Sequence, residues 1–312
     1  MPLCAISIDL DEIDCYAGIH GLPEPNAECA HAVYRRAVPR FEALFDNLDV
    51  KATFFAIGRD LVDPTAAEAL RRLHAARHEI SNHSFSHRYD LSRLPADEIK
   101  REIADGMYAI ERVTGARPLG FRAPGYLVVD AVFDALHALG ARYDSSVFPC
   151  PVYYGAKSAA LAAIALRRRT SHSIMGDPRV LLAPADPYRV GKPYYQRGKG
   201  LIELPIGVTR GPTARLPYIG TTLVLSGERY ARWLTHRILG RPLVNLELHG
   251  MDLCDAYKDG LQWLRPHQPD LRKKLADKQR ALEAAIWTLR GAGYQFVTLA
   301  QAAEQLAPTL DA

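Results

Sequence analysis

Several features that would assign a protein to a class at once are missing from this sequence. No apolar run approaches the roughly 20 residues that a membrane-spanning helix needs. The stretch Met1–Asp9 has no basic region and meets an aspartate too early for a secretory signal peptide. No repeat, low-complexity tract or recognisable nucleic-acid-binding module is present, so we expect no nucleic-acid partner. These absences favour a globular protein of the cytoplasm.

Cysteine is also scarce. The five cysteines are odd in number and include no Cys-x-x-Cys pair, so we expect reduced or buried thiols rather than disulfides or a cysteine metal site. Hydrophobic residues make up 48% and charged residues 24% of the 312 residues, which is typical of a soluble globular protein. We expect the whole chain, residues 1–312, to form one domain with a full core.

The formal net charge of +4 conceals an uneven distribution. Residues 150–240 contain fourteen Lys and Arg against four Asp and Glu, whereas the rest of the chain is net acidic. A local basic surface suits an anionic partner such as phosphate, pyrophosphate or a lipid surface. A solvated face that happens to be basic explains the same composition, and the sequence leaves both explanations open.

Short apolar runs alternate with helical patterns along most of the chain. This alternation predicts an α/β fold in which βα units form a mainly parallel sheet. Residues 150–230 break the rhythm, since Pro, Gly, Tyr and Arg prevail there, and we interpret them as a large insertion that decorates the sheet. The predicted strands are 4–8, 52–57, 78–81, 118–121, 142–143, 243–248 and 295–297, and the predicted helices are 27–48, 64–76, 95–114, 129–139, 268–291 and a last one from 299.

Polar residues recur at one kind of position in this pattern. The residues at or just beyond the C-terminal ends of predicted strands include Asp9, His83, Arg122 and His249. In βα-barrels the loops converge at that end of the strands and form the active site. We therefore expect these four side chains to belong to a single site.

Two histidines lie four residues apart in the segment Asn82–His87. On a helical turn this spacing would place the imidazoles of His83 and His87 on one face, where they could hold one cation such as zinc. Two hydrogen-bonded or surface histidines are the alternative, because the chain has eleven histidines in all. Asp9 and Asp11 follow an apolar strand, where one carboxylate could complete the metal set and the other could act as a general base. An exposed acidic turn is the alternative for this pair.

An arginine and a further histidine complete the set. Arg122 lies in the segment Phe121–Gly125, which Pro124 stiffens, so its guanidinium could orient a catalytic aspartate and hold it ionised. His249 ends the segment Leu246–His249 and could protonate a leaving amine. A surface arginine and a histidine at the edge of the core are the alternatives.

In chain order, the motifs Asp-x-Asp, His-Ser-x-x-His, Phe-Arg-x-Pro and Leu-x-Leu-His resemble those of the polysaccharide deacetylase family, the NodB-homology group of carbohydrate esterases. The strand segment Ala52–Phe55 is also similar to that family. The resemblance covers about residues 1–148 and 243–300 and leaves the basic stretch outside it. It implies a deformed, incomplete (β/α) barrel with a large insertion and a divalent metal, most often zinc (Zn²⁺).

The resemblance also implies a reaction and a role for each motif residue. The reaction is hydrolysis of an N-acyl group, acetyl or formyl, from an amino sugar. The implied metal ligands are Asp11, His83 and His87, the implied base is Asp9, which Arg122 would orient, and the implied acid is His249.

Two departures from the usual family pattern leave questions open. Leu10 separates two aspartates that are adjacent in the commoner motif, so either Asp9 or Asp11 could be the metal ligand. Asp144 has no tryptophan close by, and its role in positioning His249 is therefore a hypothesis. The candidate substrate contacts are Pro124, Tyr126 and Asp144.

Residues 157–169 bear on the substrate. They combine a short apolar helix with three arginines at 167–169, which suits a helix lying on an anionic membrane; a helix buried against the barrel is the alternative. We expect a cytoplasmic protein, with peripheral contact at the inner membrane face through this segment, that acts on a small, lipid-linked or phosphate-bearing amino sugar. Tyrosines of this region that could stack on sugars are Tyr153, Tyr154, Tyr188, Tyr194 and Tyr195.

Two rival functions fit parts of the same pattern. The barrel could hydrolyse a non-sugar C–N bond, as in a cyclic amide or ureide. Alternatively, it could be a non-catalytic barrel that binds an anionic glycolipid, which predicts no metal-dependent release of acetate or formate. The presence of all four motifs argues against the second rival.

Overall fold

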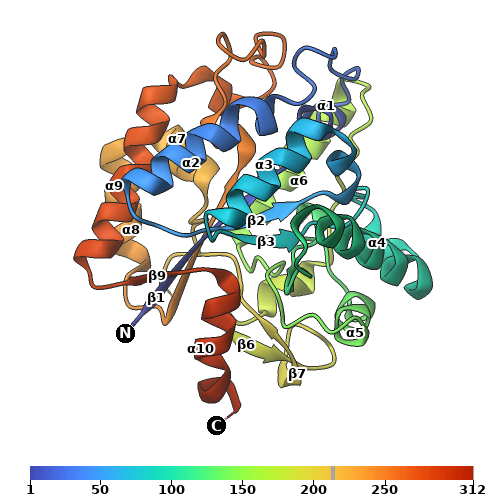
Figure 1. Ribbon diagram of the computed structural model, residues 1–312, viewed down its shortest axis with the longest axis vertical. Coiled ribbons are helices and arrows are strands. Elements are labelled where there is room, and N and C mark those ends of the chain that lie inside the picture. The colour runs from blue at the N-terminus through green and yellow to red at the C-terminus, as the bar shows by residue number, and fades with distance from the viewer. Residues whose placement is uncertain (212–214, 312) are drawn as a thin grey trace.

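One open, curled sheet organises the molecule (Figure 1). The computed structural model describes residues 1–211 and 215–311. Within these residues the strands form a nine-stranded sheet in the order β6-β7-β5-β4-β3-β2-β1-β8, with β9 paired to β1. The pairing is parallel except between β6 and β7. The strands are β1 (Leu3–Asp9), β2 (Thr53–Ala56), β3 (Glu79–Asn82), β4 (Gly120–Phe121), β5 (Tyr143–Asp144), β6 (Tyr188–Val190), β7 (Arg197–Glu203), β8 (Leu243–His249) and β9 (Gln295–Val297).

The expected deformed, incomplete (β/α) barrel is confirmed. Over the described ranges the strand path ends at β6 on one side and at β8 on the other, and these two strands do not pair. The deformation is clearest at β1, whose one edge pairs with β8 along its whole length. Its other edge pairs first with β9, over Leu3–Ala5, and then with β2, over Ser7–Asp9. The chain thus inserts its last strand beside the start of its first.

Helices cover the outer face of the sheet, and a last helix closes one end. Outward-facing side chains of the strands, such as Ile6, Ile8 and Phe54, pack in the main apolar core with α2, α3, α8 and α9. Helix α10 packs against β1 near the chain termini, which lie at the same end of the molecule (Figure 1). The α-helices of the described residues are α1 (Ile13–Ile19), α2 (Val38–Asn47), α3 (Pro64–Ala75), α4 (Ala96–Thr114), α5 (Asp130–Ala138), α6 (Pro151–Leu166), α7 (Gly220–Ser226), α8 (Glu228–Ile238), α9 (Leu275–Gly291) and α10 (Leu299–Asp311).

Residues 150–230 do more than decorate the sheet. They contain β6 and β7, and β7 pairs with β5 and so extends the parallel sheet by one strand. The first four residues of β7, Arg-Gly-Lys-Gly, are exposed and only the last three are buried, so the strand lacked the apolar pattern by which the others were predicted. Helices α7 and α8 also fall at or beyond the end of this stretch and were not predicted.

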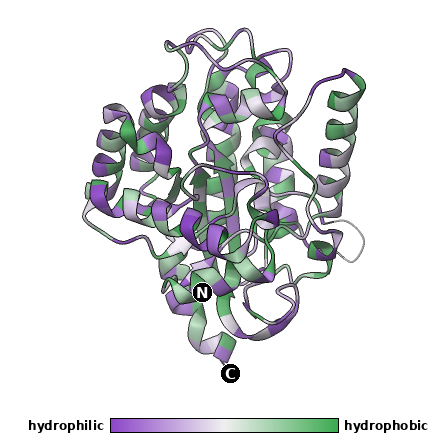
Figure 2. Ribbon diagram, turned by 90° about the vertical axis from the view of Figure 1, so that its right-hand side faces the viewer, coloured by the Kyte–Doolittle hydropathy of each residue, from purple (hydrophilic) through white to green (hydrophobic). Residues whose placement is uncertain are grey.

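Helix α6 lies at the right-hand edge of the molecule in Figure 2, and its first half is joined to the body by hydrogen bonds from Tyr154 to Gly176 and from Lys157 to Gly125. None of its residues is fully buried, so the alternative of a helix buried against the barrel is wrong. Among the described residues, no helix has both the length and the apolar character needed to cross a membrane. All five cysteines are buried free thiols, as expected.

Helix boundaries differ from the prediction at two places. The segment predicted as one helix over 27–48 begins its helical part at Val33, with a π-helix over Val33–Ala37 before α2. Helix α9 begins at Leu275 rather than at 268, because the short 3₁₀ turn Pro269–Arg272 precedes it. The short helix α1, directly after the acidic motif, was missed because it spans only seven residues.

Candidate metal and catalytic site

Strand register brings the polar motif residues onto one face of the sheet. Asp9 on β1 pairs with His249 on β8, and Ser7 pairs with Glu247. Side chains alternate along a strand, and side chains of paired residues point the same way. Ser7, Asp9, Glu247 and His249 therefore share the inner face, whereas Ile8 faces the outer helices.

Asp11, His83 and His87 converge just beyond the ends of β1 and β3. The Asp11 Oδ1 atom lies 3.2 Å from His83 Nε2 and 3.3 Å from His87 Nε2. All three residues are buried. Burial by itself raises the pKa of Asp11, but His87 and His83 outweigh it and hold that pKa well below its usual range. A carboxylate and two imidazoles at this spacing can share one ion.

The donor set of this cluster fits a divalent metal such as zinc. Asp11 Oδ1 and both ring nitrogens of His87 are buried and have no hydrogen-bond partner, an arrangement that is costly unless a cation satisfies them. The Nδ1–H of His83 donates to the Arg122 carbonyl oxygen at 2.7 Å, which leaves its Nε2 lone pair facing Asp11. Asp11, rather than Asp9, groups with both histidines.

The two histidines do not lie on a helical turn, contrary to the prediction from their spacing. The segment after β3 contains no helix until Leu91. Ser84 and His87 adopt left-handed backbone conformations, with φ of 64° and 55°, and the backbone N–H of His87 donates to Ser84 Oγ at 3.1 Å. This tight turn, and not helical periodicity, brings the two rings to a centroid distance of 4.8 Å.

Arg122 holds Asp9 in a buried network. Its Nη1 donates to Asp9 Oδ1 at 2.7 Å, and both residues are almost completely inaccessible to solvent. The other guanidinium nitrogens donate to Ser7 Oγ, Ser145 Oγ and the Ser145 carbonyl oxygen at 2.8 to 2.9 Å. The guanidinium carbon also lies 4.2 Å from the centre of the Phe55 ring. Because these contacts fix the guanidinium, its hydrogen bond holds the Asp9 carboxylate in one orientation.

His249 has a carboxylate partner that the sequence analysis did not identify. Its Nδ1 lies 2.8 Å from Glu247 Oε1, and its Nε2 lies 3.4 Å from the Tyr126 hydroxyl. Burial by itself lowers the pKa of His249, but Glu247, followed by Asp9, raises it well above the usual value. The motif Leu-Glu-Leu-His could have indicated this contact, because residues two apart on a strand, such as Glu247 and His249, share a face.

Asp144 does not contact His249, so the hypothesis that it positions this histidine is wrong. Its carboxylate is fully buried and accepts hydrogen bonds from the backbone N–H and the hydroxyl of Ser146 at 3.0 and 2.8 Å. Pro124 is buried as well, whereas Tyr126 lies beside His249. Tyr188 is completely buried and its hydroxyl donates to the Tyr194 carbonyl oxygen, so it offers no surface to a sugar.

Two cavities border these residues. One reaches His249 and is lined on its other sides by Tyr16, Tyr126, Tyr153 and Asp270. The second lies beside His87 and is lined by charged side chains that include Asp14, Arg59 and Arg88. Solvent or a substrate can therefore approach the buried cluster from the His249 side and from the His87 side.

Comparisons with known proteins agree with the motif pattern and the fold. The sequence model described as polysaccharide deacetylase matches residues 31–143, which include His83, His87 and Arg122. No curated protein sequence matches the chain. A solved structure from Mycobacterium smegmatis, described as a candidate polysaccharide deacetylase, is 18% identical with a TM-score of 0.58 over 99% of this chain and 91% of that chain. A CE4 family pseudoenzyme from Bacillus anthracis is 15% identical with a TM-score of 0.51 over 97% of this chain and 66% of that chain. The predicted family resemblance is confirmed, and at these identities the structural similarity shows the fold alone.

Proposed function

We propose that this protein, which carries a polysaccharide deacetylase domain match and the fold of that family, is a metal-dependent hydrolase that removes an N-acetyl or N-formyl group from an amino sugar. One observation supports this above all. A cluster suited to a divalent metal, an aspartate held by a buried arginine, and a histidine paired with a glutamate all lie at the same end of the sheet. A metal site, a general base and a general acid are the components that metal-assisted amide hydrolysis uses.

We assign the metal, zinc, to Asp11, His83 and His87, in preference to Asp9. When bound there, it would supply a Lewis acid that polarises the acyl carbonyl and lowers the pKa of a water molecule. Asp9, oriented by Arg122, would accept a proton from the attacking water. His249 would donate its Nε2 proton to the sugar nitrogen as the C–N bond breaks, which releases the acid and the free amine.

The role of His249 as the acid can be tested through the pH profile of a Glu247 variant. Replacing Glu247 by glutamine removes the charge that most strongly raises the pKa of His249, so that pKa falls. The protonated imidazole that the leaving amine needs is then lost at lower pH, and we expect the alkaline limb of the pH–rate profile to move to lower pH. Activity at pH 8 should fall by about tenfold, with the acid limb in place. The measurement is kcat/KM from pH 5 to 9, with Glu247→Asp as the charge-conserving control. An equal loss of activity at every pH would contradict this role.

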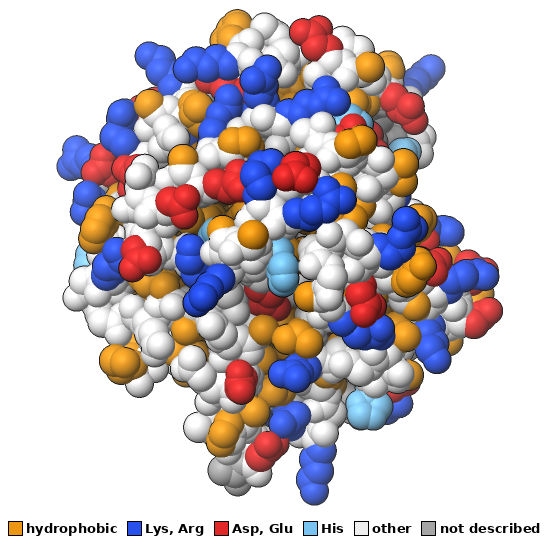
Figure 3. Space-filling model, in the orientation of Figure 1, with side chains coloured by type: hydrophobic (Ala, Val, Ile, Leu, Met, Phe, Trp, Pro, Cys, Tyr) orange, Lys and Arg blue, Asp and Glu red, His pale blue; other side chains and the backbone are white. Residues whose placement is uncertain are grey.

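The substrate class is the second part of the proposal. We propose a small amino sugar that is lipid-linked or otherwise amphiphilic, reached at the cytoplasmic face of a membrane through residues 157–169. Supporting this, α6 exposes apolar residues such as Leu166, and residues 151–169 contain four basic and no acidic side chains. On the face seen in Figure 3, by contrast, acidic and basic side chains intermingle, which suits an anionic surface less well.

Membrane contact can be measured without an assay of activity. Wild-type protein should sediment with vesicles that contain phosphatidylglycerol and much less with vesicles of phosphatidylcholine. The variant Arg167→Glu/Arg168→Glu should bind the anionic vesicles at least about tenfold more weakly, because each basic residue near such a surface contributes about 1 kcal/mol. The matched control is Lys100→Glu/Arg101→Glu, which reverses two exposed charges on α4. Equal loss of binding in both variants would show non-specific attraction and contradict the assignment to 157–169.

The experiment that tests the hydrolase proposal is release of acetate or formate from a panel of substrates by the zinc-loaded protein. The panel contains soluble N-acyl amino sugars, lipid-linked ones, acetylated sugar polymers, and cyclic amides and ureides. We expect turnover of N-acyl sugars that Asp9→Asn reduces by about 10² to 10⁴-fold. Turnover of the cyclic compounds alone would favour the rival reaction. No turnover by wild-type protein on any substrate would favour a non-catalytic barrel.

A further inference from the structure

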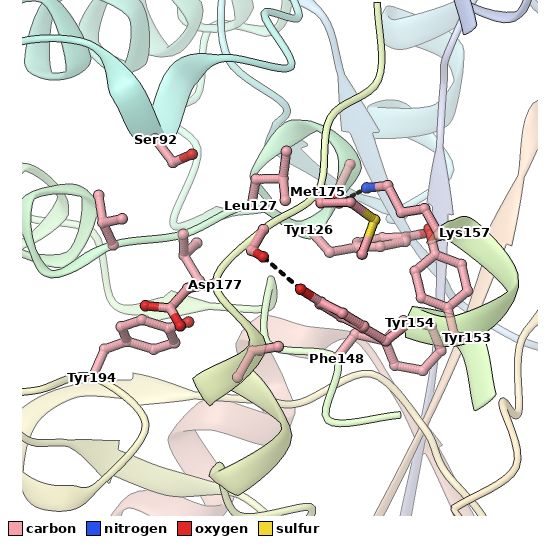
Figure 4. A pocket seen from close by; sticks show the side chains of 15 residues that line it. Ser92, Tyr126, Leu127, Phe148, Tyr153, Tyr154, Lys157, Met175, Asp177 and Tyr194 are labelled. Atoms are coloured by element: carbon pink, nitrogen blue, oxygen red, sulfur yellow. Dashed lines mark hydrogen bonds between the residues drawn. The ribbon is translucent and has the colours of Figure 1, made fainter. Parts of the chain in front are cut away.

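A cavity that the reaction does not use lies beneath the first half of α6 (Figure 4). One wall is the loop from Gly125 to Val129 that follows Arg122, and a second is formed by residues 175–180, which return from α6. Helix α6 contributes Tyr153, Tyr154 and Lys157. We call this space the α6 cavity.

The α6 cavity is lined mainly by apolar and aromatic side chains. Leu127, Phe148 and Met175 point into it, as Figure 4 shows. Two of its polar groups are already engaged: the Tyr154 hydroxyl donates to the Gly176 carbonyl oxygen at 2.9 Å, and the Asp177 carboxylate pairs with Arg179 at 2.6 Å. Such a lining accepts an apolar chain more readily than a hydrated sugar.

Lys157 brings a positive charge into this apolar space. Its Nζ donates to the Gly125 carbonyl oxygen at 3.2 Å, and within the described residues it forms no ion pair, although Asp177 lines the same cavity. Burial lowers the pKa of Lys157 to about 8. An ammonium in apolar surroundings gains strongly from an anionic partner, and it has two further N–H donors for one.

The side chain of Tyr126 lies between the α6 cavity and His249, the proposed acid. Tyr126 and Tyr153 line both this cavity and the one that reaches His249. The Tyr126 hydroxyl lies 3.4 Å from His249 Nε2. A molecule bound near His249 could therefore extend past Tyr126 toward Lys157.

We propose that the α6 cavity binds an anionic amphiphile, with an apolar chain against Leu127, Phe148 and Met175 and a phosphate group on the ammonium of Lys157. This inference rests on the proposed function, because the amphiphile would be the part of the substrate that does not react. It deepens that function by assigning recognition of the phosphate to one residue.

Binding of octyl phosphate, measured by isothermal titration calorimetry, tests the inference without turnover. The probes are octyl phosphate, octanol and inorganic phosphate, each titrated into wild-type, Lys157→Met, Lys157→Arg and Lys100→Met protein. We expect octyl phosphate to bind wild-type protein at least about tenfold more tightly than either other probe does. Lys157→Met should lose most of this difference, Lys157→Arg should keep it, and Lys100→Met, on the exposed surface of α4, should not change it.

Three outcomes would overturn the inference. They are equal binding of octyl phosphate to Lys157→Met and wild-type protein, equal binding of inorganic and octyl phosphate, and no binding of octyl phosphate. If Lys157→Met fails to fold, as thermal unfolding would show, Leu127→Trp serves instead, since its indole would fill the apolar part and weaken octyl phosphate binding. Because the titration needs no hydrolysis, repeating it on Asp9→Asn protein separates failure of this inference from failure of the proposed reaction.

Discussion

Replacing Asp11 by asparagine, or His83 by glutamine, should give a protein that no longer retains zinc and no longer hydrolyses its substrate. Asp11 is the only carboxylate that lies within 3.3 Å of both imidazoles in the described structure, so its loss leaves an incomplete ligand set. Because loss of even an outer-shell partner costs about 10 to 100-fold in affinity, we expect more than about 100-fold weaker zinc binding here. The measurement is zinc content after dialysis, together with the rate of acyl release.

The control for these variants is His74→Gln, which changes an exposed histidine on α3 and should leave zinc content and activity as they are. Zinc retained at full stoichiometry in Asp11→Asn would contradict the ligand assignment. If Asp9→Asn lost zinc and Asp11→Asn kept it, the roles of the two aspartates would be exchanged. Restored activity on addition of excess zinc to His83→Gln would show weakened binding rather than loss of folding.

Replacing Arg122 by methionine should lower the free energy of unfolding by about 3 to 5 kcal/mol. The substitution leaves Asp9 as a buried carboxylate without its guanidinium, and it also removes the donors to Ser7 and Ser145. Activity should be lost at the same time, because Asp9 loses its fixed orientation. Urea unfolding followed by circular dichroism measures the first effect, and Arg101→Met on the surface of α4 is the control.

The double variant Asp9→Asn/Arg122→Met separates stability from catalysis. Removing both charges avoids an unpaired buried ion, so part of the lost stability should return while activity stays absent. This double variant also serves if Arg122→Met does not fold. If the two substitutions had additive effects on the free energy of unfolding, Asp9 and Arg122 would not be coupled. That result would contradict the role that we give to their 2.7 Å contact.

The local pattern of apolar and polar residues predicted much of the fold. The apolar runs and helical spacings predicted seven of the strands and most of the outer helices, because burial on one face leaves a period of two or 3.6 in the sequence. Strand β7 was not predicted, because only its last three residues are buried and its place in the sheet depends on pairing with β5. The left-handed conformation of Ser84 and His87 was not predicted either, since such a turn leaves no periodic pattern of apolar residues in the sequence.

The residues alone indicated which side chains stand at the ends of the strands, and from these the family resemblance and the candidate reaction. The partners of these side chains became apparent only in the folded molecule. Asp11, and not Asp9, faces both histidines, and Glu247 takes the place beside His249 that Asp144 was expected to fill. Strand register explains the difference, because β1 and β8 are more than two hundred residues apart in the chain and only their alignment in the sheet brings Asp9 beside His249. Lys157 likewise became a candidate ligand-binding residue only because α6 packs over the Gly125 loop.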